Sequence, residues 1–235
     1  MISTAFVTGA TGYTGRAVVQ SLRDRSVDTT AHIRPASSRR EEYTEKFESI
    51  GASVDCTPWD GEAMAQTVAR LTPDVVFFLV GTTRARDRRS DDDAGYEAVD
   101  YGLLQLLVDA CTPCNPAPKF VYLSAMGVKE GALTAYYRAR YRAEEALKDS
   151  GLPYVIARPA MITGPDRRET RHMERLGGFF TDVASTTLDV VGARRLADRY
   201  RSTDATELAA SLVDLALDDE ITNRIVESEE LKRDR

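Results

Sequence analysis

The sequence is poor in metal-binding and thiol side chains, with three cysteines and two histidines in 235 residues. His32 and His172 have no ligand-like spacing, so they do not complete a structural zinc site beside Cys111 and Cys114. The Cys-x-x-Cys pair follows an expected helix instead of opening one, so it lacks the helix dipole that activates thioredoxin-like thiols. We therefore expect no metal and no redox centre, and we interpret the pair as an ordinary loop segment.

Long apolar runs and an excess of positive charge are also missing. The longest apolar run, Val75 to Val80, is far shorter than the ~20 residues that a membrane-spanning helix needs. The first expected strand follows Met1 almost at once, which leaves no room for a signal peptide. The net charge is −6, which argues against a nucleic-acid partner. Together these absences predict a cytoplasmic protein with no membrane and no nucleic-acid partner.

One stretch near the start has a specific pattern, in which an apolar strand passes through three regularly spaced glycines into a helix. Glycine adopts the positive backbone angles of a tight turn, and a diphosphate approaches the backbone only where no Cβ intervenes. The free amides and the positive dipole end of the helix then face the anion. The stretch therefore predicts nucleotide binding. We expect the contacts to come from Gly9, Thr11, Gly12, Tyr13, Thr14 and Gly15.

Strand and helix patterns alternate along the rest of the chain. Strands are expected at 29–34, 51–56, 73–80, 119–124 and 152–158, with helices between them and an edge strand at 223–226. The helix expected at 94–111 carries a broad apolar stripe that begins at Val99. This order predicts an α/β fold: a doubly wound, mainly parallel sheet (Rossmann fold) with helices on both faces. The length fits one domain, 1–235, in which 164–203 covers the substrate.

The end of the second strand indicates which dinucleotide binds. In this fold the residue closing that strand meets the adenosine ribose, where an acid binds the 2′-hydroxyl and arginine accommodates a 2′-phosphate. Arg34 stands there and Arg39 follows, so we predict NADP(H) as the cofactor. In the alternative, Arg39 only opens an exposed helix. Asp60 lies where the adenine edge is expected, and it fits equally well as the cap of the helix that begins after it.

Residues at the ends of the later strands complete the expected site. Backbone at the carboxyl end of a parallel strand lies by the cofactor, and the fourth strand ends in Gly81, Thr82 and Thr83. Ser124 ends the fifth strand, and a helix that begins near Tyr136 follows it. We therefore expect the chemistry to take place between the fifth strand and this helix.

The glycine spacing, the interval from Ser124 to Tyr136 and the Arg158-Pro159 ending of the sixth strand resemble the short-chain dehydrogenase/reductase superfamily, in its atypical, NADP-binding branch. The resemblance covers residues 4 to 159 and extends more weakly to 226. It implies that Ser124 and Tyr136 hydrogen-bond a substrate carbonyl and that the residue four positions after the tyrosine binds the nicotinamide ribose. It also implies that a segment after the sixth strand wraps the nicotinamide, here Pro159, Ala160, Met161 and Ile162.

One position departs from the pattern of that superfamily, which has lysine where this chain has Arg140. A free tyrosine needs a nearby cation to exchange protons at neutral pH. Arginine keeps the charge and can bind both ribose hydroxyls, but it cannot release a proton, so a lysine-style relay is lost. We favour Tyr136 with Arg140 over Tyr137, whose fourth neighbour, Tyr141, carries no charge. In the alternative, these aromatic rings only pack the helix.

The sequence thus predicts an NADPH-dependent oxidoreductase that transfers hydride between the nicotinamide and a small carbonyl, alcohol, quinone or enone substrate. In this hypothesis Ser124 polarises the substrate oxygen, Tyr136 exchanges the proton and Arg140 holds the ribose and the charge. Two alternatives are a redox-neutral epimerase or isomerase with a tightly held cofactor, and a non-catalytic NADP-binding sensor or scaffold. The resemblance also implies a homodimer that pairs through the helices at 94–111 and 134–150.

Overall fold

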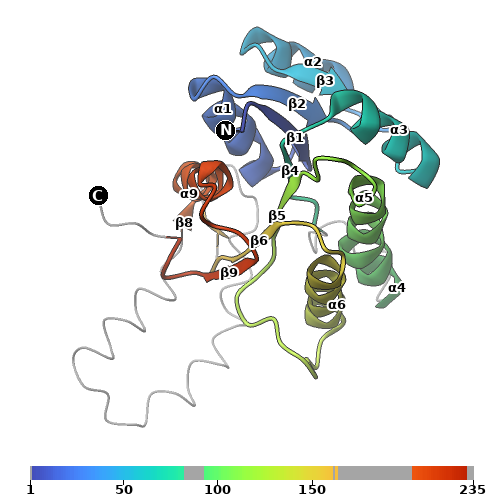
Figure 1. The fold of residues 1–235 in the computed structure, drawn as a ribbon, viewed down its shortest axis with the longest axis vertical. Coiled ribbons are helices and arrows are strands. Elements are labelled where there is room, and N and C mark those ends of the chain that lie inside the picture. Colours follow the sequence, from blue (N-terminus) through green and yellow to red (C-terminus); the bar gives the residue numbers. More distant parts are fainter. Residues whose placement is uncertain (1, 82–92, 161, 164–202, 232–235) are drawn as a thin grey trace.

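The chain folds around a sheet of seven parallel strands in the order β3-β2-β1-β4-β5-β6-β9 (Figure 1). This is a computed structural model, which describes residues 2–81, 93–160, 162–163 and 203–231. Every strand pair in this sheet is parallel. The strands are β1 (Thr4–Thr8), β2 (Asp28–His32), β3 (Ser53–Asp55), β4 (Val75–Phe78), β5 (Lys119–Leu123), β6 (Tyr154–Arg158) and β9 (Arg224–Glu227).

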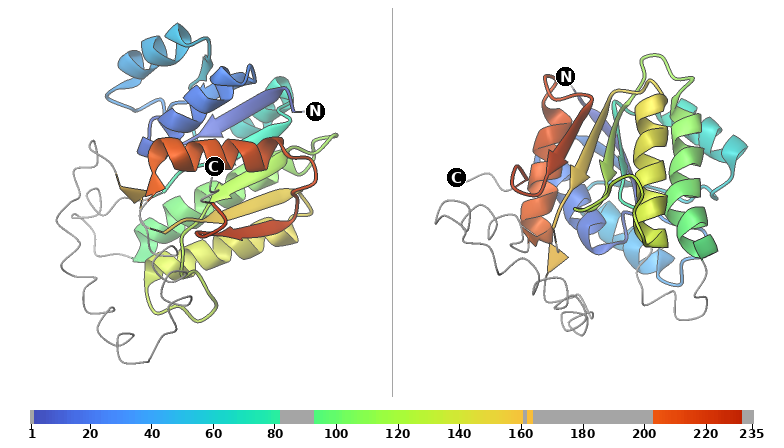
Figure 2. Two further views of the ribbon diagram at one scale, coloured as in Figure 1. Left: turned by 90° about the vertical axis from the view of Figure 1, so that its left-hand side faces the viewer. Right: turned by 90° about the horizontal axis from the view of Figure 1, so that it is seen from below.

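Helices cover both faces of this sheet, as Figure 2 shows. On one face lie α1 (Tyr13–Asp24), α2 (Arg40–Ser49) and α9 (Ala205–Leu217). On the other lie α3 (Gly61–Leu71), α5 (Leu103–Cys111) and α6 (Ala135–Asp149). The predicted doubly wound α/β fold is confirmed. None of the helices in the described ranges is long and apolar enough to cross a membrane.

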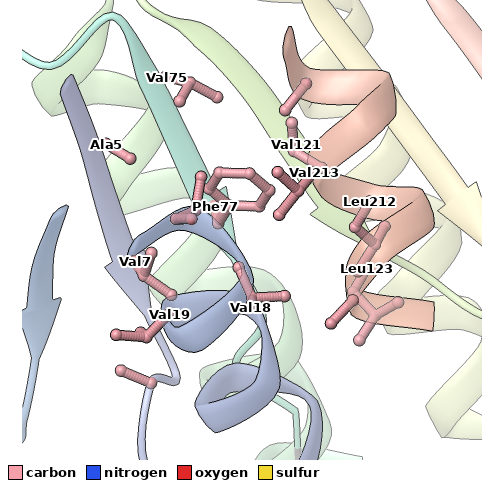
Figure 3. Close-up of a cluster of buried hydrophobic side chains, with 14 of the residues drawn as sticks. Ala5, Val7, Val18, Val19, Val75, Phe77, Val121, Leu123, Leu212 and Val213 are labelled. Atoms are coloured by element: carbon pink, nitrogen blue, oxygen red, sulfur yellow. The ribbon is translucent and has the colours of Figure 1, made fainter. Parts of the chain in front are cut away.

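The central strand β4 explains the continuous apolar run in the sequence. Because side chains alternate along a strand, Val75 and Phe77 face α1 and α9, while Val76 and Phe78 face α3 and α5. All four side chains are fully buried. Figure 3 shows Phe77 among the valines of α1 and Val213 of α9. This two-sided core fixes the carboxyl end of β4, next to which the glycine turn lies.

The helix expected at 94–111 is not uniform. It consists of α4 (Asp93–Tyr96), a π-helical segment η1 (Glu97–Gly102) and α5. Val99, expected to face the core, is half-buried, whereas Asp100 is only 1% exposed. The π-helical segment has i→i+5 hydrogen bonds instead of i→i+4, so the α-helical periodicity does not carry through it. As a result, a carboxylate from η1 points into the interior toward α6.

The C-terminal part completes the sheet and one helical layer. Asp204 caps α9 by accepting a hydrogen bond from the Thr206 amide at 2.9 Å, and β9 pairs with β6. The expected helix and edge strand are thus confirmed. A second, small sheet was not expected: β7 (Ile162–Thr163) pairs with β8 (Thr203–Asp204).

A buried lysine fastens α9 to the start of β5. The Lys119 ammonium donates hydrogen bonds to the carbonyl oxygens of Leu215, Ala216 and Asp218 at 2.9, 3.1 and 2.7 Å. These carbonyls belong to the last turn of α9 and to its C-cap, Asp218, where helix carbonyls lack intrahelical partners and the dipole favours a cation. Lys119 therefore satisfies the C-terminal end of α9.

Candidate cofactor and substrate site

The glycine turn packs directly on the end of β4. Gly9 has a φ of +74°, and a Cβ there would lie 2.6 Å from the carbonyl carbon of Leu79. A Cβ on Gly15 would lie 2.2 Å from the carbonyl oxygen of Gly9. Both distances are too short for any side chain, so this close approach of β1, β4 and α1 requires glycine at both positions.

The N-terminus of α1 lacks a side-chain cap. Its capping residue, Gly12, is exposed, supplies no side-chain hydrogen bond, and no acid stands in the first turn. The first amides of the helix therefore face the carboxyl edge of the sheet without an acceptor from a capping side chain. A diphosphate fits this cradle, since it can approach the bare backbone and accept from these amides. Thr11 and Tyr13 are half-buried beside it, and Thr14 is buried.

Arginines gather at the adjacent end of β2, around Tyr43 of α2. Arg39 lies with its guanidinium carbon 4.7 Å from the centre of the Tyr43 ring. Arg16, at the end of the first turn of α1, donates from Nη1 to the Tyr43 hydroxyl at 3.0 Å. Arg34 stands two residues after the end of β2 and is exposed. A hollow of about 570 Å³, lined by residues 35–42, opens beside them.

The sequence analysis did not identify Arg16 as a residue of this site, although its position near a helix N-terminus was a signal. A cation near a helix N-terminus opposes the helix dipole, so its presence there indicates a local reason. Glu42 balances part of this charge: Arg39 donates from Nε and Nη2 to the two Glu42 carboxylate oxygens at 2.7 and 2.5 Å. This hydrogen bonding lowers the pKa of Glu42. The expected phosphate ligand Arg39 is therefore already paired with an exposed carboxylate.

Of the other residues expected to contact the cofactor, the structure describes Asp60 and Gly81. Asp60 caps α3, with its Oδ1 accepting from the Ala63 amide at 3.0 Å, so its interpretation as a helix cap is confirmed. A cofactor contact from its second oxygen stays a prediction. Gly81 lies against Arg140, because a Cβ on it would come within 2.7 Å of Arg140 Nη2. Thr82 and Thr83 lie outside the described residues, as does the segment 164–202.

Arg140 is buried and points across the carboxyl ends of β4 and β5. Its Nη1 donates to the carbonyl oxygen of Leu123 at 2.6 Å, and its Nη2 donates to Asp100 Oδ1 at 3.0 Å. Its guanidinium carbon lies 4.9 Å from the centre of the Tyr136 ring and 5.9 Å from that of Tyr122. Both outer nitrogens thus have protein partners, so the paired donors of the guanidinium are not available to bind two ribose hydroxyls.

Asp100 is the site residue that the sequence analysis missed, and its side chain is fully buried in the ion pair. Burial alone lowers the pKa of Arg140, but Tyr136, Tyr122 and Asp100 outweigh it and hold that pKa above its usual range. The guanidinium is therefore a permanent cation that cannot donate a proton. Two buried polar atoms beside this pair, Arg140 Nε and the Tyr122 hydroxyl, lack hydrogen-bond partners among the described residues.

Ser124 has a different partner from the one expected. Its hydroxyl donates to Glu144 Oε1 at 2.5 Å, and Glu144 is fully buried. Arg158 donates to both oxygens of Glu144, at 3.0 and 2.5 Å, and to Glu227 at 3.0 Å. Because the hydroxyl hydrogen of Ser124 is given to a carboxylate, it is not available to polarise a substrate oxygen. The structure instead places Ser124 in a buried network that joins β5, α6, β6 and β9.

The same network positions the segment expected at the nicotinamide. Pro159 follows Arg158 directly, and its carbonyl oxygen accepts from the Met126 amide at 3.0 Å. The Ala160 amide donates to the Ser228 hydroxyl at 3.1 Å. Ile162 belongs to β7. These contacts bring the loop after β5 and the segment after β6 together at the edge of the sheet that carries the glycine turn.

A match to a protein family identifies the ligand class of this cradle. Residues 9–193, more than half of the chain, match the family described as NAD(P)H-binding. The chain belongs to the NAD(P)H-binding family. The match begins at the first glycine of the turn, in agreement with the bare backbone and uncapped helix described above.

Two of the proteins to which this NAD(P)H-binding chain is similar have enzyme names. The "uncharacterized sugar epimerase YhfK" of Bacillus subtilis (strain 168) is 26% identical over 197 residues, which cover 78% of this chain and 85% of YhfK. The Citrobacter sp. triphenylmethane reductase, solved with NADP(H), superposes with a TM-score of 0.62 at 17% identity, over 94% of this chain and 68% of that one. The expected resemblance to atypical short-chain dehydrogenases/reductases is thus confirmed.

A third relative carries the other dinucleotide. The Bordetella bronchiseptica enzyme WbmH, solved with NAD+, superposes with a TM-score of 0.63 at 20% identity, over 91% of this chain and 72% of that one. The two solved relatives support the fold, and together they include both NAD+ and NADP(H). The choice between these cofactors therefore depends on the residues at the end of β2.

Cys111 and Cys114 of this NAD(P)H-binding chain lie at the C-terminal end of α5. Cys111 is buried as the last residue of α5, and Cys114 is half-buried just beyond it. Burial raises the pKa of both thiols, which opposes the thiolate that metals and disulfide exchange require. No cluster of His, Cys, Asp and Glu that could hold a metal occurs in the described part of the chain.

Proposed function

We propose that this chain is an NADPH-dependent oxidoreductase that exchanges hydride with an unsaturated carbonyl-type substrate. The observation that carries the proposal is the packing of Tyr136 on the buried Arg140 guanidinium, at the sheet edge that bears the glycine cradle. NADPH would supply the hydride, held through its diphosphate by the amides of α1. Tyr136 is half-buried, so its phenol can reach a substrate oxygen and exchange a proton with it.

In this proposal Arg140 acts as a fixed charge and not as a proton carrier. Asp100 and the Leu123 carbonyl hold its guanidinium over the Tyr136 ring. A preorganised cation next to a site of developing negative charge stabilises that charge without rearrangement. The proton that Tyr136 gives up must then return from solvent, because neither Arg140 nor Ser124 is placed to supply it.

The preference for NADPH over NADH rests on the arginines around Tyr43. A 2′-phosphate is a dianion, and arginine binds it through charge-assisted, paired hydrogen bonds. Arg39 and Arg16 both contact Tyr43. Arg39 also lines a hollow in which Ser37 and Ser38 add hydroxyls, and Arg34 stands in the same connection between β2 and α2. No acid occupies the end of β2, where one would bind the 2′-hydroxyl of NAD.

Titration of the purified protein with NADPH and NADH tests this preference. Arg34→Ala should weaken NADPH binding by about tenfold to hundredfold, as expected for a lost hydrogen bond to a charged group, and leave NADH binding nearly unchanged. Arg25→Ala, which removes an arginine of α1 that pairs with Asp214, is the matched control. Equal losses for both cofactors would remove Arg34 from the phosphate site. Mass spectrometry of any nucleotide that co-purifies gives an independent result.

A second candidate is a protein that binds NADP without net turnover, either as a sensor or scaffold or as a redox-neutral epimerase. The specific observation in its favour is that the donors of both Ser124 and Arg140 are already bound to protein groups. The similarity to YhfK adds support for the epimerase form. Tyr136→Phe separates an enzyme from a scaffold, because it should abolish turnover in either enzyme and leave NADPH binding and partner binding intact in a scaffold. Net consumption of NADPH then separates the oxidoreductase from the redox-neutral epimerase.

A further inference from the structure

Three tyrosines from two elements meet at the substrate side of the site. The Tyr136 ring lies edge-to-face with Tyr96, at a centroid distance of 5.7 Å, and with Tyr137, at 5.1 Å. Tyr96 ends α4, and the other two open α6, so all three lie near the carboxyl edge of the sheet. Each ring is half-buried and keeps part of its surface accessible. Aromatic rings arranged in this way offer faces and edges to a further planar ring.

The arginines of α6 and β6 around these rings have protein partners. Arg140 pairs with Asp100, and Arg142 pairs with Glu97. Arg158 is shared between Glu144 and Glu227, and Arg138 donates to the Leu133 carbonyl at 2.7 Å. A substrate diphosphate would have to displace one of these contacts. Within residues 93–160, this side of the site therefore suits an uncharged substrate better than a nucleotide sugar.

An exposed apolar side chain lies just before α6. Leu133, one residue before the Thr134 cap of α6, is 93% exposed, and it is the only large apolar side chain with high exposure in the described residues. Arg138 donates a hydrogen bond to the Leu133 carbonyl and holds the Leu133 backbone in place, so the exposed leucine belongs to an anchored segment. A leucine left in water lacks the favourable free energy of burial, part of which a bound apolar ligand would recover.

We propose that the substrate is a planar, uncharged, conjugated carbonyl compound of the quinone or aryl-enone class. Its ring would pack against Tyr96, Tyr136 and Tyr137, with Leu133 over its outer edge. This inference rests on the proposed oxidoreductase function and narrows its substrate class. The reaction is balanced: one NADPH and one proton are consumed per quinone, and NADP+ and the hydroquinone are formed, with the two electrons carried as hydride.

Binding measurements test the inference without relying on turnover. Menadione, cyclohexanone and UDP-glucose are titrated calorimetrically into the NADP+-loaded protein. We expect menadione to bind and the other two to bind at least tenfold more weakly. Tyr96→Leu and Leu133→Ser should each weaken menadione binding by about threefold to tenfold, the range of one aromatic or apolar contact. NADP+ binding should not change in either variant.

Tyr101→Leu is the matched control, since Tyr101 lies on the same helical stretch but lines an outer hollow with Arg142. It should leave menadione binding unchanged. If UDP-glucose binds more tightly than menadione, or if cyclohexanone binds as well as menadione, the substrate class is wrong even though the protein binds NADP+. If NADP+ and NADPH themselves do not bind, the proposed function fails at an earlier step.

Discussion

The buried ion pair between Asp100 and Arg140 leads to a quantitative prediction. Asp100→Asn removes the negative charge and keeps an oxygen that can accept the 3.0 Å hydrogen bond. The Arg140 side chain is only 7% exposed and that of Asp100 is fully buried, so the remaining cation would be buried without a counter-charge. Breaking such a pair costs about 3–5 kcal/mol, and the retained acceptor places this substitution near the lower limit. For a chain of this size, about 3 kcal/mol corresponds to a Tm lower by about 6–12 °C.

The chain contains a matched control in the same π-helical segment. Glu97 also pairs with an arginine of α6, Arg142, but both side chains are well exposed, at 41% and 55%. Glu97→Gln should therefore cost ~0–1 kcal/mol. Thermal unfolding followed by circular dichroism, with and without NADPH, compares the two variants. A loss of stability in Asp100→Asn no larger than in Glu97→Gln would refute the reasoning. The double variant Asp100→Leu with Arg140→Met should recover most of the loss, because it removes both charges.

Three further predictions follow from other contacts. Ser124→Ala should lower the free energy of unfolding by about 1–3 kcal/mol but change kcat by less than about threefold. Loss of a donor that polarises the substrate would instead lower kcat by about 10²–10³. A kcat loss of that size in a variant that still folds would contradict the view that Ser124 serves only to bind Glu144. Glu42→Gln should tighten NADPH binding by about twofold to fivefold at low salt by freeing Arg39, and an equal gain for NADH would argue against a phosphate site. Burial raises the pKa of Asp74, but hydrogen bonds from Ser3 and Thr4 outweigh it and hold that pKa below its ordinary range. The contribution of Asp74 to stability is therefore present above about pH 4 and is lost as the pH falls through the lower pKa of the folded state. Urea denaturation at a series of pH values should show that the free energy of unfolding falls less steeply with acid in Asp74→Asn than in the wild type. An equally steep fall would rule the contact out.

The sequence predicted those features that depend on neighbouring residues. The glycine turn, the alternation of strands and helices, and the cap at Asp60 all follow from local backbone requirements, and the structure confirms them. The family resemblance came from the same local patterns. The local structure and the family resemblance can both be recognised from the sequence because a strand, a turn or a cap is specified within a few residues.

The site partners were missed where the contact joins distant segments. Asp100 meets Arg140 across 40 residues, and Arg16 meets Tyr43 across 27. Nothing local marks Asp100, because the π-helical segment breaks the periodicity that would place it in the core. Glu144 was within reach of sequence reasoning, since it stands four residues after Arg140 on the buried face of α6. A buried acid at that spacing is a signal for an ionic partner.

The contact between Lys119 and α9 also bears on how the chain folds. The lysine binds carbonyls that lie 96 to 99 residues later in the sequence, and sheets assembled from such distant parallel pairings fold slowly. During synthesis, the β1 to β6 portion exists before the segment that covers it. Until 203–231 docks, Val18, Phe77 and Val121 lack the cover that Leu212 and Val213 provide. Docking of the segment 203–231 therefore decides whether this half of the core closes or stays exposed to aggregation.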